Sequence, residues 1–232
     1  MIIDSHTHIG FEENTQKQNP EELMKWMDIA KVDKSVIFPL GPTEGKEQSY
    51  FKENENISKQ LDNPRFIVFG RVNQLSQDSL QEVDHIKSLG LKGIKMHSEA
   101  AGFLGFDELF KKIEESGLPL IVHTGESEKS SVSNLENIPF NGNLIIGHGG
   151  KGHFKEAIRL VNSRNNFFIE TSLLSLRRTK IIIGEVIDKS KILFGSDAPF
   201  NPPEMEIRKL EYACKDKELL ADILGNNILR IL

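Results

Sequence analysis

Near the N-terminal end of the chain lies the segment Ile2-Ile3-Asp4-Ser5-His6-Thr7-His8-Ile9-Gly10. Side chains alternate between the two faces of a β-strand, so His6 and His8 project to the same side of a strand formed by this segment. Two imidazoles at that spacing can reach a single metal ion, and zinc binds imidazole nitrogen at about 2.0–2.1 Å. A pair of surface histidines is the plain alternative, and the rest of the chain decides between the two.

The composition is that of an ordinary soluble globular protein. The chain has 232 residues, of which 38% are hydrophobic and 27% are charged, and its formal net charge is −5. Acidic and basic residues are interspersed without a basic stripe, so the electrostatics do not favour nucleic-acid binding. The single cysteine, Cys214, excludes an internal disulfide and is compatible with a reducing compartment. We see neither a signal peptide nor a run of about 18 apolar residues, and we therefore expect a cytoplasmic protein without a membrane span.

Short apolar runs alternate with helical patterns along the whole chain. After the first segment, strands are expected over Ser35–Leu40, Arg65–Val72, Lys92–His97, Leu118–His123, Asn143–His148, Asn166–Thr171 and Lys191–Asp197. Helices are expected over Pro20–Lys31, Glu47–Leu61, Ser79–Leu89, Phe106–Ser116, Phe154–Ser163 and Leu174–Lys189, with a short one within Ser130–Phe140 and one or two after Pro203. Eight β/α units in roughly 200–250 residues predict an α/β fold, a closed (β/α)₈ TIM barrel that fills residues 1–232 as a single domain. A doubly wound open sheet is the alternative.

Histidines and acids recur at the ends of the expected strands. Five of the seven histidines lie there, and only His85 and His153 do not. The carboxyl ends of barrel strands converge on one mouth, where catalytic residues gather. Taken singly, each residue has a structural explanation, such as a turn for Asp197 or an ion pair between Lys95 and Glu170. Together they favour an active site, with the candidates His6, His8, Lys95, His97, His123, His148, Glu170 and Asp197.

These motifs resemble the amidohydrolase superfamily, and within it the amidohydrolase-2 group, which includes metal-dependent hydrolases and aminocarboxymuconate-semialdehyde-type decarboxylases. The resemblance spans almost the entire chain. The matching segments are Ile3–His8, Lys92–His97, Ile121–Gly125, Ile145–Gly150, Ile169–Ser172, Leu193–Pro199 and Ile223–Leu232.

The resemblance implies a role for each candidate. One divalent metal ion, most often zinc, would be held by His6, His8, His123 and Asp197. His148 would orient or polarise a metal-bound water, and Asp197 would also take the proton of that water. Substrate contacts would come from Lys95, His97 and Glu170. A bound cation brings the pKa of its water near neutrality, and a neighbouring carboxylate can relay the proton.

The number of metal ions stays open at this point. Superfamily members with two metals often carry a carboxylated lysine at the end of the fourth strand, and Lys95 stands two residues before His97. A carboxylated Lys95 would bridge two ions, with His148 as a ligand. We favour one ion because the amidohydrolase-2 pattern is usually mononuclear. TatD-type deoxyribonucleases share the first histidine pair, but we find no convincing counterpart of their acidic ligand on the fourth strand.

The expected function is a metal-dependent hydrolase, in which metal-activated water attacks a C–N or C–O bond of an amide, lactone or cyclic amidine in a small polar metabolite. The nearest alternative is a metal-dependent, non-oxidative decarboxylase of a small carboxylic acid. A binuclear amidohydrolase or phosphoesterase, and a barrel that binds a ligand without catalysis, are the others. The expected partner is a small-molecule substrate, and a homodimer is in keeping with the resemblance because family members are often dimers.

Overall fold

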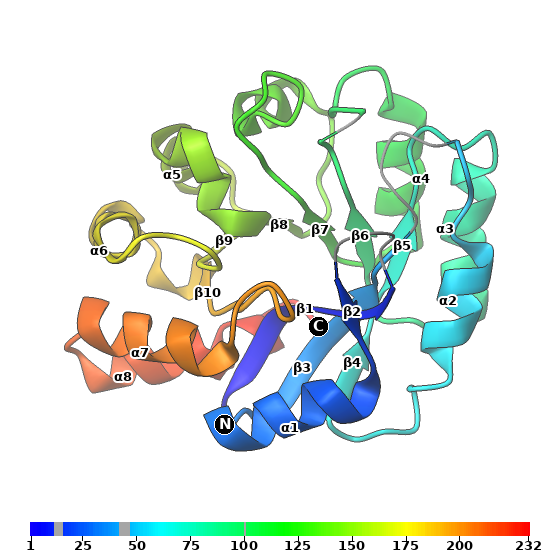
Figure 1. Ribbon diagram of the computed structural model, residues 1–232. Coiled ribbons are helices and arrows are strands. Elements are labelled where there is room, and N and C mark those ends of the chain that lie inside the picture. The colour runs from blue at the N-terminus through cyan, green and yellow to red at the C-terminus, as the bar shows by residue number, and fades with distance from the viewer. Residues whose placement is uncertain (12–15, 42–46, 100) are drawn as a thin grey trace.

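Parallel strands form the centre of the molecule, and helices surround them (Figure 1). The computed structural model describes residues 1–11, 16–41, 47–99 and 101–232. The strands of the ring are β1 (Ile3–Phe11), β3 (Lys34–Pro39), β4 (Phe66–Val68), β5 (Gly70–Val72), β6 (Ile94–Met96), β7 (Leu120–Val122), β8 (Leu144–Ile146), β9 (Phe167–Glu170) and β10 (Ile192–Leu193). A short strand, β2 (Lys17–Gln18), pairs antiparallel with the end of β1.

The strands close into a ring at two places. The segment that holds β4 and β5 changes partner at Phe69, whose N–H donates to Ile37 O (2.9 Å), while the N–H of Gly70 donates to Gly93 O (2.9 Å). The chain after β10 meets β1, where the N–H of Asp197 donates to His6 O (2.8 Å). With β4 and β5 taken as one strand, the order β1-β3-β4/β5-β6-β7-β8-β9-β10 gives eight positions. The fold is therefore the expected (β/α)₈ barrel and not an open sheet.

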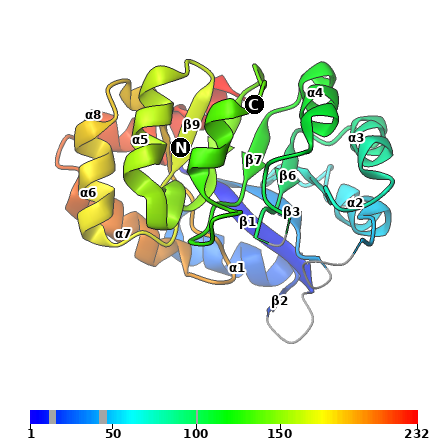
Figure 2. The ribbon, with the colours of Figure 1, turned by 90° about the horizontal axis from the view of Figure 1, so that it is seen from above.

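The helices follow the strands in the order that the barrel requires. They are α1 (Pro20–Ala30), α2 (Phe51–Ser58), α3 (Ser79–Ser88), α4 (Asp107–Ser116), α5 (Phe154–Ser163), α6 (Leu176–Glu185), α7 (Pro203–Ala213) and α8 (Lys217–Ala221). Short 3₁₀ or π turns cover Val132–Asn137, Gly147–His153, Lys189–Lys191, Asp222–Asn226 and Ile228–Arg230. In the view from above, α2, α3 and α4 lie on one side of the strands and α5, α6 and α7 on the other (Figure 2). No helix in these described ranges is long and apolar enough to cross a bilayer.

Several elements are shorter than the sequence-based expectation, among them β10 (Ile192–Leu193) and α6 (Leu176–Glu185), and two others differ for local reasons. The helix expected over Glu47–Leu61 covers only Phe51–Ser58, and just before it the N–H of Tyr50 donates to the Glu82 carboxylate instead of facing a helical turn. The sixth strand ends at Ile146 because His148, Gly149 and Gly150 adopt left-handed backbone angles, with φ of 55°, 57° and 78°. This turn brings the His148 side chain over the barrel mouth.

Apolar side chains fill the lower part of the barrel and leave its carboxyl end to polar ones. A buried cluster inside the ring contains Ile3, Val36, Phe38, Phe69, Ile121, Ile145, Phe168 and Leu193, and Ile228 and Ile231 from the C-terminal turn join it. A larger cluster lies between the strands and the helices. Layered packing of this kind makes the interior of the barrel a core and not a pore. The polar residues of the mouth therefore rest on a rigid apolar floor.

Candidate metal centre

Three donor atoms from the first and last strands meet at the mouth. Asp197 Oδ1 lies 3.1 Å from His6 Nε2 and 3.0 Å from His8 Nε2. Two ligands bound at about 2.1 Å to one ion, with a bond angle of roughly 90–110°, lie about 3.0–3.4 Å apart. Asp197 adopts a left-handed backbone conformation (φ 66°), which places its carboxylate beside the two imidazoles. The spacing of these atoms fits a shared cation.

His148 brings a further nitrogen to this group. Donor atoms of His6, His148 and Asp197 lie within 4.8 Å of one another, and all three side chains are buried. His148, which the sequence suggests as a group that acts on water, thus stands among the metal-binding donors. His123, which the sequence suggests as a ligand, contacts this group through His148, since its Nδ1 lies 3.0 Å from His148 Nε2.

The protonation states of the site suit a metal ion. Burial lowers the pKa of His8 to about 3 and that of His123 to about 4, and burial also holds the pKa of His148 well below its usual value. Burial opposes the charge of Asp197, but His148 and His6 outweigh it and hold the pKa of this carboxyl well below its usual range. Neutral imidazoles and an ionised carboxylate are the forms that bind metal ions. His6 differs: burial and Lys95 oppose its protonation, yet Asp197 and Glu170 leave its pKa raised.

Two buried polar atoms near this centre have no hydrogen-bond partner among the described residues. They are His8 Nδ1 and Asp4 Oδ2. Asp4 uses its other oxygen to accept the N–H of His6 (3.1 Å) and of Ser196 (2.9 Å). Burial raises the pKa of Asp4 to about 7. Asp4 therefore ties β1 to the chain after β10, although nothing in the sequence pattern marks it as more than part of the first motif.

Lys95 and His97 take different positions on the same face of β6. Lys95 is fully buried, and its Nζ lies 3.1 Å from His6 Nε2 and 4.8 Å from the centre of the Phe38 ring. His97 stacks on His123 with ring centres 3.8 Å apart. The sequence suggests both as substrate contacts. In the structure Lys95 contacts the donor atom of His6 directly, whereas His97 is separated from the donor group by His123.

Glu170 contacts the histidines of the centre. It is fully buried, and its Oε1 lies 3.0 Å from His6 Nδ1, on the side of that ring opposite to the donor atom Nε2. Ser172 and the backbone N–H of His148 also donate to this carboxylate. The structure thus shows Glu170 in contact with the histidines of the centre, and the substrate contact expected for it stays a prediction.

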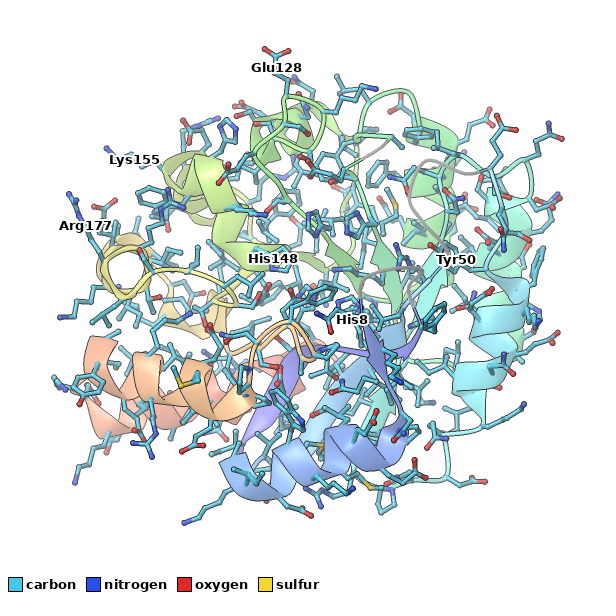
Figure 3. The ribbon with its side chains drawn as sticks, viewed as in Figure 1. His8, Tyr50, Glu128, His148, Lys155 and Arg177 are labelled. Carbon is cyan, nitrogen blue, oxygen red and sulfur yellow. The ribbon has the colours of Figure 1, made fainter. Side chains whose placement is uncertain are left out.

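Arg71 is a cation of the mouth that the sequence analysis did not single out. It pairs in register with Lys95 across β5 and β6, so both side chains point to the same face of the sheet. Its Cζ lies 4.7 Å from the centre of the Tyr50 ring, and Nη1 donates to Pro39 O (3.3 Å). Its place near the end of the third expected strand is the signal that could have identified it. Figure 3 shows Tyr50 and His148 on either side of His8 around the mouth.

The chain resembles known proteins in its sequence profile and in its fold. The profile of the family described as Amidohydrolase matches residues 60–232, well over half of the chain. No curated protein matches the chain at the level of sequence.

Solved structures match the chain over nearly its whole length. One is 5-carboxyvanillate decarboxylase from Sphingomonas paucimobilis, with 16% identity and a TM-score of 0.74 over 99% of this chain and 98% of that one. An uncharacterized TIM-barrel protein from Bordetella bronchiseptica has 16% identity and a TM-score of 0.76 over 99% and 97%. A dihydroxybenzoic acid decarboxylase from Polaromonas sp. JS666, with bound manganese, has 13% identity and a TM-score of 0.73 over 99% and 96%. At these identities the likeness establishes the fold.

Proposed function

The chain belongs to the amidohydrolase family, and we propose that it is a metal-dependent decarboxylase that removes carbon dioxide from a small carboxylic acid. The hydrolase expected from the sequence, with His123 as the fourth ligand and His148 acting on water, is the second candidate. Two of the similar structures reported above are decarboxylases of aromatic acids, which supports the choice. The observation that carries it is the amino group of Lys95, which is fully buried 3.1 Å from the donor atom Nε2 of His6.

His6, His8, His148 and Asp197 would hold the ion. When bound, a divalent ion would bind and polarise an oxygen of the substrate carboxylate. Imidazole and carboxylate ligands suit several divalent metals, and geometry and availability select among them. We propose manganese or zinc: zinc because it suits imidazole donors, and manganese because the decarboxylase from Polaromonas sp. JS666 holds it.

The cations of the mouth fit an anionic substrate. Lys95 lies inside the barrel and Arg71 lies beside it on the neighbouring strand. A charge that is buried in the barrel is stabilised only when an opposite charge or strong hydrogen bonds accompany it. A substrate carboxylate bound at the mouth would be attracted by both side chains. An amide or a lactone offers these residues no negative charge.

The decarboxylation needs one proton on the carbon that loses the carboxylate. Asp197 is an ionised carboxylate in the donor group, and it would take this proton from a water molecule and pass it to the substrate. The proton adds to the carbon, the bond between this carbon and the carboxylate then breaks, and its electron pair restores the double bond of the substrate as carbon dioxide leaves. The aromatic rings of Phe38 and Phe200 beside His8 suit an unsaturated or aromatic acid.

The first test is carbon dioxide release from 5-carboxyvanillate and from a panel of dihydroxybenzoates, with protein reconstituted with Mn²⁺ or with Zn²⁺. We expect metal-dependent release by the wild type and a loss of at least about 10³-fold in Asp197→Asn, because that variant loses both a metal ligand and a proton carrier. Circular dichroism checks that the variant is folded. Release that is unchanged in Asp197→Asn would refute the mechanism.

Hydrolysis remains the second candidate because of one further observation. His123 Nδ1 and His148 Nε2 form a second pair of facing nitrogens, 3.0 Å apart, and Lys95 stands beside His6. Two adjacent donor groups suit two metal ions, and a binuclear centre activates water for attack on a C–N or C–O bond. Metal analysis distinguishes the candidates: two ions per chain, with turnover of lactones or amides and no release of carbon dioxide, would replace the decarboxylase with the hydrolase.

A further inference from the structure

The Glu170 carboxylate receives four hydrogen-bond donors, and all four come from histidines of the centre or from a serine that contacts one of them. Ser172 donates through its N–H (2.6 Å to Oε2) and its hydroxyl (2.8 Å to Oε1). His6 Nδ1 lies 3.0 Å from Oε1, and the N–H of His148 donates to the same oxygen. The Ser172 hydroxyl in turn lies 2.7 Å from His148 Nδ1. We call Glu170 and Ser172 the orienting pair.

These contacts determine which nitrogen of each ring carries the proton. A carboxylate only accepts hydrogen bonds, so His6 must carry its proton on Nδ1. The Ser172 hydroxyl gives its hydrogen to Glu170 and can only accept from His148, so His148 also carries a proton on Nδ1. Nε2 of His6 then lies 3.1 Å from Asp197 Oδ1, and Nε2 of His148 lies 3.0 Å from His123 Nδ1. In the neutral form that binds a metal ion, each of these Nε2 atoms carries the lone pair. The Nζ of Lys95, a donor, lies 3.1 Å from His6 Nε2, as this tautomer requires.

The neighbouring strand leaves room for this carboxylate. A Cβ atom at Gly195 would lie 2.5 Å from Glu170 Oε2 and 3.0 Å from His6 Cβ. The backbone of Gly195 has no left-handed φ, so an L side chain is excluded at this position by space alone. A glycine beside β9 therefore keeps the carboxylate and the His6 ring in contact.

We propose that Glu170 is a positioning residue that orients two of the four proposed metal-binding donors at once, His6 directly and His148 through Ser172. The inference rests on the metal centre of the proposed function. Outer carboxylates of this kind fix the tautomer and orientation of a ligand histidine. Here a single carboxylate serves two histidines that are 142 positions apart in sequence, so its loss would release both together.

The test compares Mn²⁺ affinity and histidine tautomers in four proteins: the wild type, Glu170→Gln, Ser172→Ala and the double variant. In Glu170→Gln we expect the affinity, measured by chelator competition, to fall roughly 10–100-fold, since an amide nitrogen cannot accept from these donors. Ser172→Ala removes only the contact between Glu170 and His148 Nδ1, so its Mn²⁺ affinity should fall less. The double variant should be no weaker than Glu170→Gln, because both changes act through one carboxylate. Glu206→Gln is the matched control, a buried carboxylate that contacts Asn201 and Lys209 instead, and its affinity should stay within about 3-fold of the wild type.

The tautomers are read by ¹⁵N NMR of the metal-free proteins at alkaline pH. We expect the Nδ1–H form for His6 and His148 in the wild type and a mixture of forms in Glu170→Gln. Wild-type affinity and unchanged tautomers in Glu170→Gln would overturn the proposal, as would equal losses in the Glu206 control. If Glu170→Gln does not fold, wild-type affinity and an unchanged His148 tautomer in Ser172→Ala would do so. A wild type that binds no metal would refute the proposed function, while the NMR result would still decide the role of Glu170.

Discussion

Two buried carboxylates, Glu170 in the barrel mouth and Glu82 on α3, have pKa values that are shifted in opposite directions. Both are fully buried, and both accept backbone N–H groups. Burial raises the pKa of Glu82 to about 7. Burial acts in the same direction on Glu170, but His6 outweighs it, and the pKa of Glu170 is lowered to about 2. The contrast shows that neighbouring histidines, and not the degree of burial, decide which carboxylate stays charged.

The two carboxylates also do different work. Glu82 connects chain segments, since it accepts the N–H of Tyr50 before α2 and that of Asn73 after β5 (2.8 Å). It thereby fixes the segment that carries the Tyr50 ring under Arg71. Glu170 instead holds side chains of the metal centre. A protonated glutamic acid suffices for the first task, but orienting two histidines requires an acceptor without a proton of its own.

The pH dependence of stability gives the largest expected difference between the two carboxylates. The pKa of Glu82 is about 7 and that of Glu170 about 2, against an ordinary value of 4.5. Each difference changes the free energy of unfolding by roughly 3 kcal/mol across the pH range between the two values. Glu82 stabilises the fold fully below pH 4.5, and this contribution is lost as the pH rises through about 7. The contribution of Glu170 is present above pH 4.5 and is lost as the pH falls toward about 2. Urea unfolding of the metal-free wild type, Glu82→Gln and Glu170→Gln proteins at pH 3, 5 and 8 measures the two contributions to stability.

The two variants should change stability with pH in opposite ways. Between pH 5 and 8, Glu82→Gln should lose less stability than the wild type does. The deficit of Glu170→Gln relative to the wild type should be largest at pH 8 and shrink at pH 3. Parallel pH profiles for the two variants would mean that burial alone sets both acidities and that His6 does not keep Glu170 charged.

A smaller effect is expected from Gly195→Ala, which disturbs Glu170 without removing its charge. The added Cβ would overlap Glu170 Oε2 and press on His6. Overpacking of a buried site costs about 1–3 kcal/mol, and we expect a weaker affinity for Mn²⁺ as well. Thermal unfolding and chelator competition check the two effects. A stable variant with wild-type affinity would show that the carboxylate has more room than the structure indicates.

The smallest expected effect comes from the matched substitution at Gly184, in the last turn of α6. A Cβ there meets nothing within 4 Å, and its backbone φ is ordinary. Gly184→Ala should raise stability by about 0.5–1 kcal/mol because alanine loses less backbone freedom on folding. Metal affinity should not change. If Gly184→Ala and Gly195→Ala were to act alike, the packing argument for Gly195 would fail.

Much of the fold and part of the centre could be predicted from the sequence. The alternation of apolar runs and helical patterns predicted the barrel, because strand and helix periods are local properties. The strand-end positions of His6, His8, His148 and Asp197 followed from the same pattern, since barrel strands converge at their carboxyl ends. The end of the sixth strand was misplaced, because the left-handed turn at His148 depends on its contacts with Glu170 and Ser172.

The sequence by itself determined the barrel and a mouth rich in histidines and acids. Only the tertiary structure decided that Glu170 contacts His6, 164 positions away in the chain, and that Asp197 contacts His8, 189 positions away. Only the structure placed Arg71 beside Lys95. Only the structure showed that the pKa of Glu82 is raised while that of Glu170 is lowered. The physical reason is that strand and helix patterns act over a few neighbouring residues. The charge and orientation of a buried side chain depend on which distant groups closure of the ring brings within about 3 Å of it.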